Sequence, residues 1–327
     1  MIFTCDVSSP FERFRESLHK GVWISSCQCL HTLLLFAWRL HHPNAGKPEG
    51  VLRSEDSRVH ADPCQEFILL DTVRIALLHL APVPGDLTQN RRVIEKAITI
   101  AARSGVSWVI TPECCVCGYT FTDAIGTDWI LPQPDQWMTR VCQLAARLRV
   151  TIFLSHPERD PQSQTLHNTV FVISCDGVIA GTHRKINALH TGSESWSTPG
   201  VQVMPIHVQP VEPVGILICA DAFTPEIAKS LAGQGARLLV SSAAWAPGFH
   251  GPNGEWERCT EDTGLPLLVC NRTGRDRTLD FAAAESVVVK DGKRLLTMSS
   301  DRSTIFIVEW HLEGQNLATP EYQRIHL

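Results

Sequence analysis

The sequence lacks a long uninterrupted apolar stretch. A helix that spans a bilayer needs about 20 consecutive apolar residues, and the most apolar segment, residues 21–40, contains Gln28, His31 and Arg39. Its longest clean run covers only residues 32–38. Charged residues crowd the segment just upstream and no clear small-residue cleavage site follows, so a signal peptide fits poorly as well. We therefore expect neither a membrane anchor nor a membrane partner.

The sequence also lacks an excess of positive charge. The formal net charge is −5 at pH 7 and the pI is about 6.3, which argues against nucleic acid or an anionic membrane as the main partner. The 12 cysteines follow no regular spacing, and a chain of 327 residues does not need disulfide staples. Reduced thiols in a cytoplasmic protein are the simpler expectation. With 44% hydrophobic and 19% charged residues, a packed core is expected.

The first 70 residues differ in character from the rest of the chain. We interpret residues 1–70 as an extension, with one helix within residues 11–40 and a polar linker over residues 41–65. A regular domain then covers residues 71–312, followed by a C-terminal tail at 313–327. No internal repeat or low-complexity tract is present.

Strand and helix patterns follow one another from Thr72 onward. Predicted strands cover residues 73–80, 106–110, 150–154, 168–174, 177–183, 214–218, 237–241, 267–271, 285–289, 294–298 and 303–309. Predicted helices cover residues 87–103, 135–149, 224–233 and 255–263. Parallel units mixed with hairpins indicate an α/β protein in which two sheets pack together with helices outside.

Cys219 stands at the end of the most distinctive stretch. Val214–Ile218 is a short apolar run typical of a buried parallel strand. Thr224, Pro225 and Glu226 suit the N-cap and first turn of a helix. A thiol at a strand end near a helix N-terminus can have a lowered pKa and act as a nucleophile. The alternative is a structural cysteine buried in the core.

Two further charged residues follow predicted strands. Glu113 comes after one strand and Lys185 after another. Each alone could be an ordinary surface charge. With Cys219 they form a usable chemical set, because a carboxylate can move protons and an ammonium can lower the pKa of the thiol and stabilise an oxyanion.

Motifs along the chain strengthen this set. They are Thr111-Pro-Glu113, His167-Asn168-Thr169, Asp176-Gly177, His183-Arg-Lys185, Glu194 through Pro199-Gly200, Gly215 through Asp221, Pro225-Glu226, Ser241 through Trp245 and Asn271-Arg-Thr-Gly274. In this order and spacing the chain resembles the nitrilase superfamily of carbon–nitrogen hydrolases over about residues 72–310. The resemblance implies a four-layer αββα sandwich, a homodimer or larger homo-oligomer, and a Glu-Lys-Cys triad. The triad falls on Glu113, Lys185 and Cys219, and a second glutamate of the family on Glu194.

The chain departs from the family pattern directly after Cys219. Nitrile-hydrolysing members usually carry Trp-Glu there and many amide-cleaving members carry an aromatic residue and Asp, whereas this chain has Ala220-Asp221. We therefore expect hydrolysis of a small amide, without a metal or an organic cofactor. The residues proposed to line the substrate pocket are Tyr119, His183, Ala220 and Trp245.

Three other functions stay open from the sequence. The first is a nitrilase, or an acyltransferase that uses an amine in place of water. The second is a thiol-rich metal or redox protein centred on Cys114, Cys115 and Cys117. The third is a catalytically silent binding module on the same fold.

Overall fold

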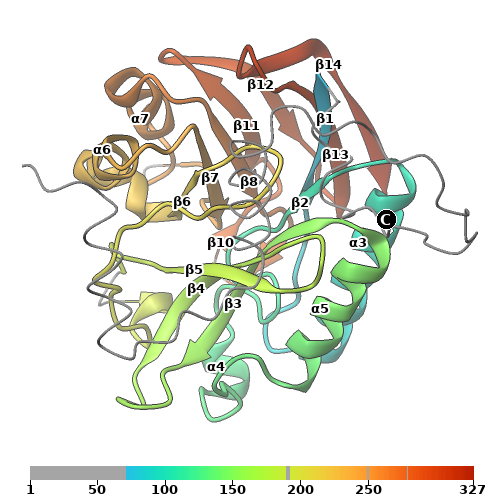
Figure 1. Cartoon of the computed structure of the whole chain (residues 1–327). Helices are drawn as coiled ribbons and strands as arrows, with labels where there is room; N and C mark the ends of the chain where they lie inside the picture. Colours follow the sequence, from blue (N-terminus) through green and yellow to red (C-terminus); the bar gives the residue numbers. More distant parts are fainter. Residues whose placement is uncertain (1–70, 189–191, 249, 278) are drawn as a thin grey trace, which may run out of the picture. The chain divides into compact units, whose positions relative to one another are not determined.

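Two β-sheets organise the part of the chain that the computed structural model describes, residues 71–188, 192–248, 250–277 and 279–327 (Figure 1). The first sheet has the strand order β14 (Asn316–His326), β13 (Thr304–His311), β1 (Thr72–His79), β2 (Trp108–Ile110), β3 (Thr151–Arg159), β4 (Leu166–Ile173) and β5 (Ile179–Arg184). The second has the order β12 (Lys293–Ser299), β11 (Glu285–Lys290), β8 (Leu267–Asn271), β7 (Leu238–Ala243) and β6 (Val214–Ile218). The predicted extension, with its helix and linker, lies outside the described residues.

Alternation along the strands gives each sheet two apolar faces. Ile75 and Leu77 of β1 are buried in the core shared with the second sheet. Ala76 and Leu78 belong to a separate core on the opposite face. Because successive side chains of a strand point to opposite faces, a strand that is covered on both sides reads as continuously apolar.

Helices cover the outer face of each sheet (Figure 1). On the first sheet lie α3 (Leu87–Arg103) and α5 (Gln136–Leu148). Their N-caps are Asp86 and Asp135, whose side chains accept hydrogen bonds from backbone N–H groups of the first turn. On the second sheet lie α6 (Pro225–Gly233) and α7 (Glu255–Thr263). The resulting α–β–β–α layering confirms the predicted sandwich.

The structure adds elements that the sequence patterns did not reveal. Residues 313–327, expected as a tail, contain β14, which pairs antiparallel with β13 at the edge of the first sheet. A five-residue 3-10 helix, η3 (Cys219–Phe223), separates the Cys219 strand from α6. Smaller additions are α4 (Thr122–Ile125), η2 (Gly192–Glu194), β9 (Arg275–Asp276) and β10 (Leu279–Asp280).

The cysteines of the described residues differ from the expectation in one place. Seven of them carry free thiols, whereas Cys175 is disulfide-bonded. Of the helices in the described ranges, none has the length and apolar character that crossing a bilayer requires.

Candidate active site

Cys219 occupies a strained turn directly after β6. Its φ is +46°, a left-handed conformation that is uncommon for a residue with a side chain. Such strain persists only where the surroundings hold the backbone in place. Cys219 is only 5% exposed, and it lines a cavity at this turn.

The Asp221 carboxylate holds this turn together. One oxygen accepts the N–H groups of Ile186 (3.0 Å) and Asn187 (2.8 Å). The other accepts the N–H of Ile218 (2.9 Å) and a hydrogen bond from His183 Nε2 (2.9 Å). Burial alone would raise the pKa of Asp221, but the His183 and backbone hydrogen bonds lower it. Asp221 is therefore ionised, and its carboxylate holds the turn at Cys219 in place.

His183, predicted to line the substrate pocket, lies elsewhere in the structure. The ring is 2% exposed and bonds to Asp221, and it is not among the residues that line the cavity beside Cys219. Its contact in the described structure is with the carboxylate that holds the turn.

Beside Cys219 lies a buried cluster of three charged side chains. Lys185 Nζ donates to Glu113 Oε1 at 2.7 Å and to Glu194 Oε1 at 2.6 Å. All three side chains are at most 1% exposed. Glu113 follows β2, Lys185 follows β5 and Glu194 closes η2, so strand ends far apart in the sequence supply one cluster. Burial of these charges is tolerable because each has a partner of opposite sign.

Asn168 completes the cluster, and sequence reasoning assigned it no role. Its amide nitrogen donates to Glu113 Oε1 (2.8 Å) and to Glu194 Oε1 (3.0 Å). Its backbone carbonyl accepts the backbone N–H of Lys185 at 2.8 Å. The signal was present in the motif His167-Asn168-Thr169. Only the antiparallel pairing of β4 with β5, however, places Asn168 beside Lys185.

The electrostatics of the cluster correct one expectation. The pKa of the Cys219 thiol is raised, because burial and the nearby Glu113 charge outweigh the opposite effect of Lys185. Burial would lower the pKa of Lys185, but the surrounding acidic groups raise it. The thiol is thus protonated at rest and needs a base, rather than being a preformed thiolate.

A backbone group holds the second oxygen of Glu113. The Ala244 N–H donates to Glu113 Oε2 at 3.0 Å. Burial and the nearby Glu113 charge raise the pKa of Glu194 to about 7.

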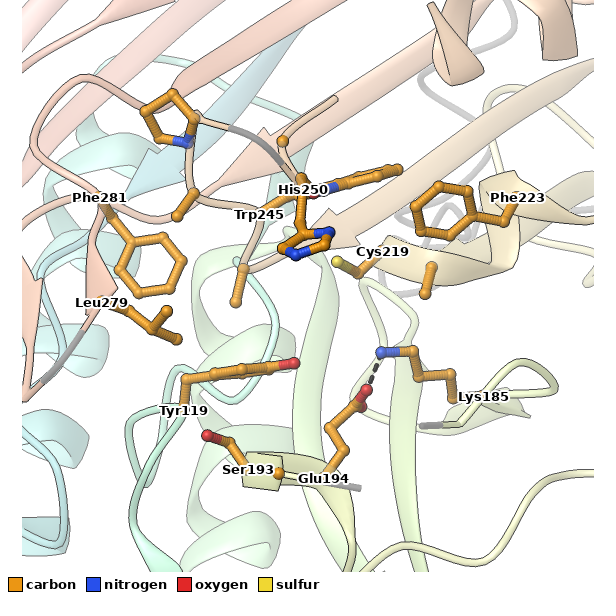
Figure 2. Close-up of a pocket in the computed structure, with 16 residues that line it drawn as sticks. Tyr119, Lys185, Ser193, Glu194, Cys219, Phe223, Trp245, His250, Leu279 and Phe281 are labelled. Carbon is orange, nitrogen blue, oxygen red and sulfur yellow. Dashed lines mark hydrogen bonds and ion pairs between the residues drawn. The ribbon is translucent and has the colours of Figure 1, made fainter. Parts of the chain in front are cut away.

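A cavity of about 680 Å³ opens above the cluster, and Figure 2 shows its lining. Three of the four predicted pocket residues line it: Tyr119, Ala220 and Trp245. Lys185, Glu194 and Cys219 line it as well. Lining residues that sequence reasoning missed include Ser193, Phe223, His250, Leu279 and Phe281. Their motifs carry no catalytic signature, and only the fold brings them together.

A second buried ion pair supports the wall of this cavity. The Asp276 carboxylate pairs with Arg272 and accepts the N–H groups of Tyr119 (2.7 Å) and Thr120 (3.3 Å). The Arg272 guanidinium lies 4.4 Å from the centre of the Phe281 ring. Two residues of the cavity wall, Tyr119 and Phe281, are therefore positioned by one pair.

Comparison with known proteins identifies the family. The sequence pattern of the carbon-nitrogen hydrolase family matches residues 74–314. The chain belongs to the carbon–nitrogen hydrolase family. A probable nitrilase of Schizosaccharomyces pombe is 24% identical over 242 residues, which cover 71% of this chain and 86% of that protein.

Solved structures of the nitrilase superfamily share the fold. Nit3 of Saccharomyces cerevisiae aligns with a TM-score of 0.66 and 23% identity, over 75% of this chain and 92% of that one. An amidase of Nesterenkonia sp. AN1 aligns with a TM-score of 0.60 and 21% identity, over 74% and 91%. That structure records the acetamide moiety of fluoroacetamide added covalently to the active-site cysteine of the amidase.

Family membership makes this chain a carbon–nitrogen hydrolase, which sets aside the binding module and the thiol-centred protein. Cys114, Cys115 and Cys117 lie in the buried interior of the hydrolase. The pKa of Cys114 is raised, mainly by a hydrogen bond with Cys117 and secondly by burial. Within the described ranges, no group of three or more His, Cys, Asp or Glu side chains is placed to hold a metal ion.

Proposed function

We propose that the hydrolase cleaves small amides through a thioester on Cys219. The observation that carries this proposal is the buried cluster of Lys185 with Glu113 and Glu194, which adjoins the thiol at the cavity. With Cys219, the cluster provides one proton acceptor, one fixed cation and one nucleophile beside one cavity. These are the three parts that acyl transfer to a thiol requires.

The first half of the reaction forms the thioester. Glu113 accepts the proton of the Cys219 thiol as sulfur attacks the amide carbon. The Lys185 ammonium and the backbone N–H of Ala220 stabilise the oxyanion that develops. Glu113 then gives its proton to the leaving nitrogen, and the C–N bond breaks to release ammonia or an amine. The raised pKa of the thiol supports this assignment, since a base must be at hand.

The second half restores the enzyme. Glu113, again ionised, takes a proton from water as its oxygen attacks the thioester carbon. The tetrahedral intermediate collapses, the C–S bond breaks, and the Cys219 sulfur recovers the proton from Glu113. The products are a carboxylic acid and the free thiol. Glu194 and Asn168 orient Lys185 and Glu113 throughout.

Two features favour an amide over a nitrile. Glu194 lines the cavity, and its second carboxyl oxygen is buried without a hydrogen-bond partner. An amide NH2 group can donate to that oxygen, whereas a nitrile has no donor. Ala220 in place of an aromatic residue also leaves room beside the thiol for a planar amide. Asp221 contributes nothing here, because its oxygens are occupied by the turn.

A matched series of amides and nitriles with the same acyl groups tests the proposal. We expect kcat/KM for ammonia release to be roughly tenfold or more higher for the amides, or about 1.4 kcal/mol of barrier. Intact mass measured during turnover should show an acyl adduct on Cys219. Equal or faster release from the nitriles would instead favour the nitrilase alternative.

A further inference from the structure

The two charged residues of Asp, Glu, Arg or Lys type that line the described cavity pair with each other. They are Lys185 and Glu194, and the distance from Lys185 Nζ to Glu194 Oε1 is 2.6 Å. Of the other described lining residues, none is Asp, Glu, Arg or Lys, and the remaining ionisable side chains are Tyr119, Cys219 and His250. Apart from this pair, in which one Glu194 oxygen has no hydrogen-bond partner, the described walls offer no acidic group to a cationic substrate and, His250 apart, no basic group to an anionic one.

Apolar side chains flank the thiol on both sides. Figure 2 shows Leu279 and Phe281 at one end of the cavity and Phe223 at the other, with Trp245 between. An acyl group bound to Cys219 meets apolar surface toward either end of the cavity. Burying a charged group on such surface without a partner is costly, whereas burying apolar area is favourable.

The aromatic rings are arranged to receive another ring. Phe223 is 51% exposed although it stands at the cavity, and its ring centre lies 4.8 Å from that of Trp245 at a tilt of 57°. Phe281 meets Tyr119 edge to face at 6.3 Å. Aromatic pairs favour such tilted geometries, and a ring beside Phe223 would cover apolar surface that is now exposed.

From these walls we infer that the preferred substrate is a primary amide of an uncharged aromatic carboxylic acid, such as an arylacetamide. The inference rests on the proposed amide hydrolysis and adds the chemical class of the acyl group. The ring lies against Phe223 and Trp245 or against Leu279 and Phe281, and the amide lies over Cys219. Acyl groups that end in a carboxylate, and amines linked through a carbamoyl group, are poor substrates.

Four compounds of graded charge test this class. They are phenylacetamide, propionamide, the monoamide of glutaric acid, and an N-carbamoyl diamine. We expect kcat/KM for phenylacetamide to exceed the values for both charged compounds at least tenfold. A cation can bind ring faces, so a preference for the carbamoyl diamine would overturn the inference, as would a preference for the glutaric monoamide. Either result would leave amide hydrolysis intact. Failure of all four compounds to release ammonia or acylate Cys219 would overturn the proposed function as well.

Single substitutions locate the ring. Phe223→Ala and Leu279→Ala each remove one apolar end, and we expect at least one of them to lower the ratio of phenylacetamide to propionamide turnover about fivefold or more. Leu131→Ala is the matched control, since Leu131 is 50% exposed and lies outside the cavity lining. An unchanged ratio in both variants would overturn the inference. So would selective loss of glutaric monoamide turnover in His250→Gln, because it would identify His250 as a carboxylate anchor.

Discussion

Two buried ion clusters lie beside the same cavity, and they are built differently. In the first, Lys185 bonds to two carboxylates, and one oxygen of Glu194 has no hydrogen-bond partner. In the second, Arg272 pairs with Asp276, and both oxygens of Asp276 are occupied by Arg272, Tyr119 and Thr120. Arg272 and Asp276 are fully buried, so water does not explain the difference.

We propose that the contrast separates a reactive cluster from a structural one. A satisfied buried pair fixes the backbone and side chains around it, and removing one partner leaves an uncompensated charge. A cluster with a spare acceptor and excess negative charge is poised for protons and substrate. We therefore expect substitutions in the Lys185 cluster and at Cys219 to change mainly activity, and substitutions in the Arg272 pair to change mainly stability.

The largest effect is expected at the nucleophile. Cys219→Ser should lower kcat/KM by several powers of ten, because members of a triad act as a unit, while the free energy of unfolding stays close to that of the parent. Parallel urea unfolding and amide turnover measure both. Cys114→Ser and Cys117→Ser are the matched controls, since both thiols are buried nearby. Substantial turnover by Cys219→Ser with a dead Cys114 or Cys117 variant would move the active site.

The Arg272 pair should show the opposite balance. Arg272→Met strands the Asp276 charge and should lower the free energy of unfolding by about 3–5 kcal/mol. In the enzyme that remains folded, KM should rise by a larger factor than kcat falls. The reason is that Tyr119 and Phe281 shape the cavity walls and do not contact the reacting atoms. Arg294→Met is the control. Arg294 forms a partly exposed pair with Glu257 and Glu285, which should be worth about 1 kcal/mol or less. A similar small effect at Arg272 would erase the contrast.

The sequence alone could predict most helices and strands and the candidate reactive residues, but not the residues of the cavity wall. The pattern of apolar residues predicted α3, α7, β6 and β8 with their observed bounds. Burial of one or both faces of an element leaves such a pattern directly in the sequence. Strand β14 escaped, since its side chains are mostly exposed and its stability comes from backbone pairing with β13. The expected homo-oligomer stays a prediction, which light scattering would test.

The candidate site shows the same limit. Glu113, Lys185 and Cys219 carry unusual chemistry at strand ends and could be found from the sequence. Phe223 and Phe281 are ordinary apolar residues whose place in the cavity depends on loops between distant strands. The bond between His183 and Asp221 could not be predicted, because only the fold brings the two residues together. Contacts over such separations leave no local pattern.

A smaller effect should distinguish the clusters by pH. Burial and the Glu113 charge raise the pKa of Glu194 from 4.5 to about 7. The folded state thus prefers the protonated form, and this stabilisation is fully present below about pH 4.5 and is lost as the pH rises through about 7. The unfolding free energy of the parent minus that of Glu194→Gln should fall over this window, by at most about 1.4 kcal/mol per pH unit. Urea titrations at pH 5, 6 and 7 measure the slope, and a flat difference would contradict the assignment.

The smallest effect is expected from removing the extension. We propose that a chain starting at Asp71 keeps the hydrolase activity. The reason is that β1 begins at Thr72 and pairs with β2 and β13 within the described residues, and the Asp71 carbonyl already accepts the Leu312 N–H at 2.9 Å. Both ion clusters lie wholly after Asp71, so each should keep its partners. We expect kcat/KM within about twofold of the full chain and an unchanged effect of Arg272→Met in the shortened one. Because Cys175 is disulfide-bonded, a full-length Cys175→Ser variant is the control for loss of that disulfide. If the shortened chain aggregates while that control is active, residues 1–70 contribute to the hydrolase domain itself.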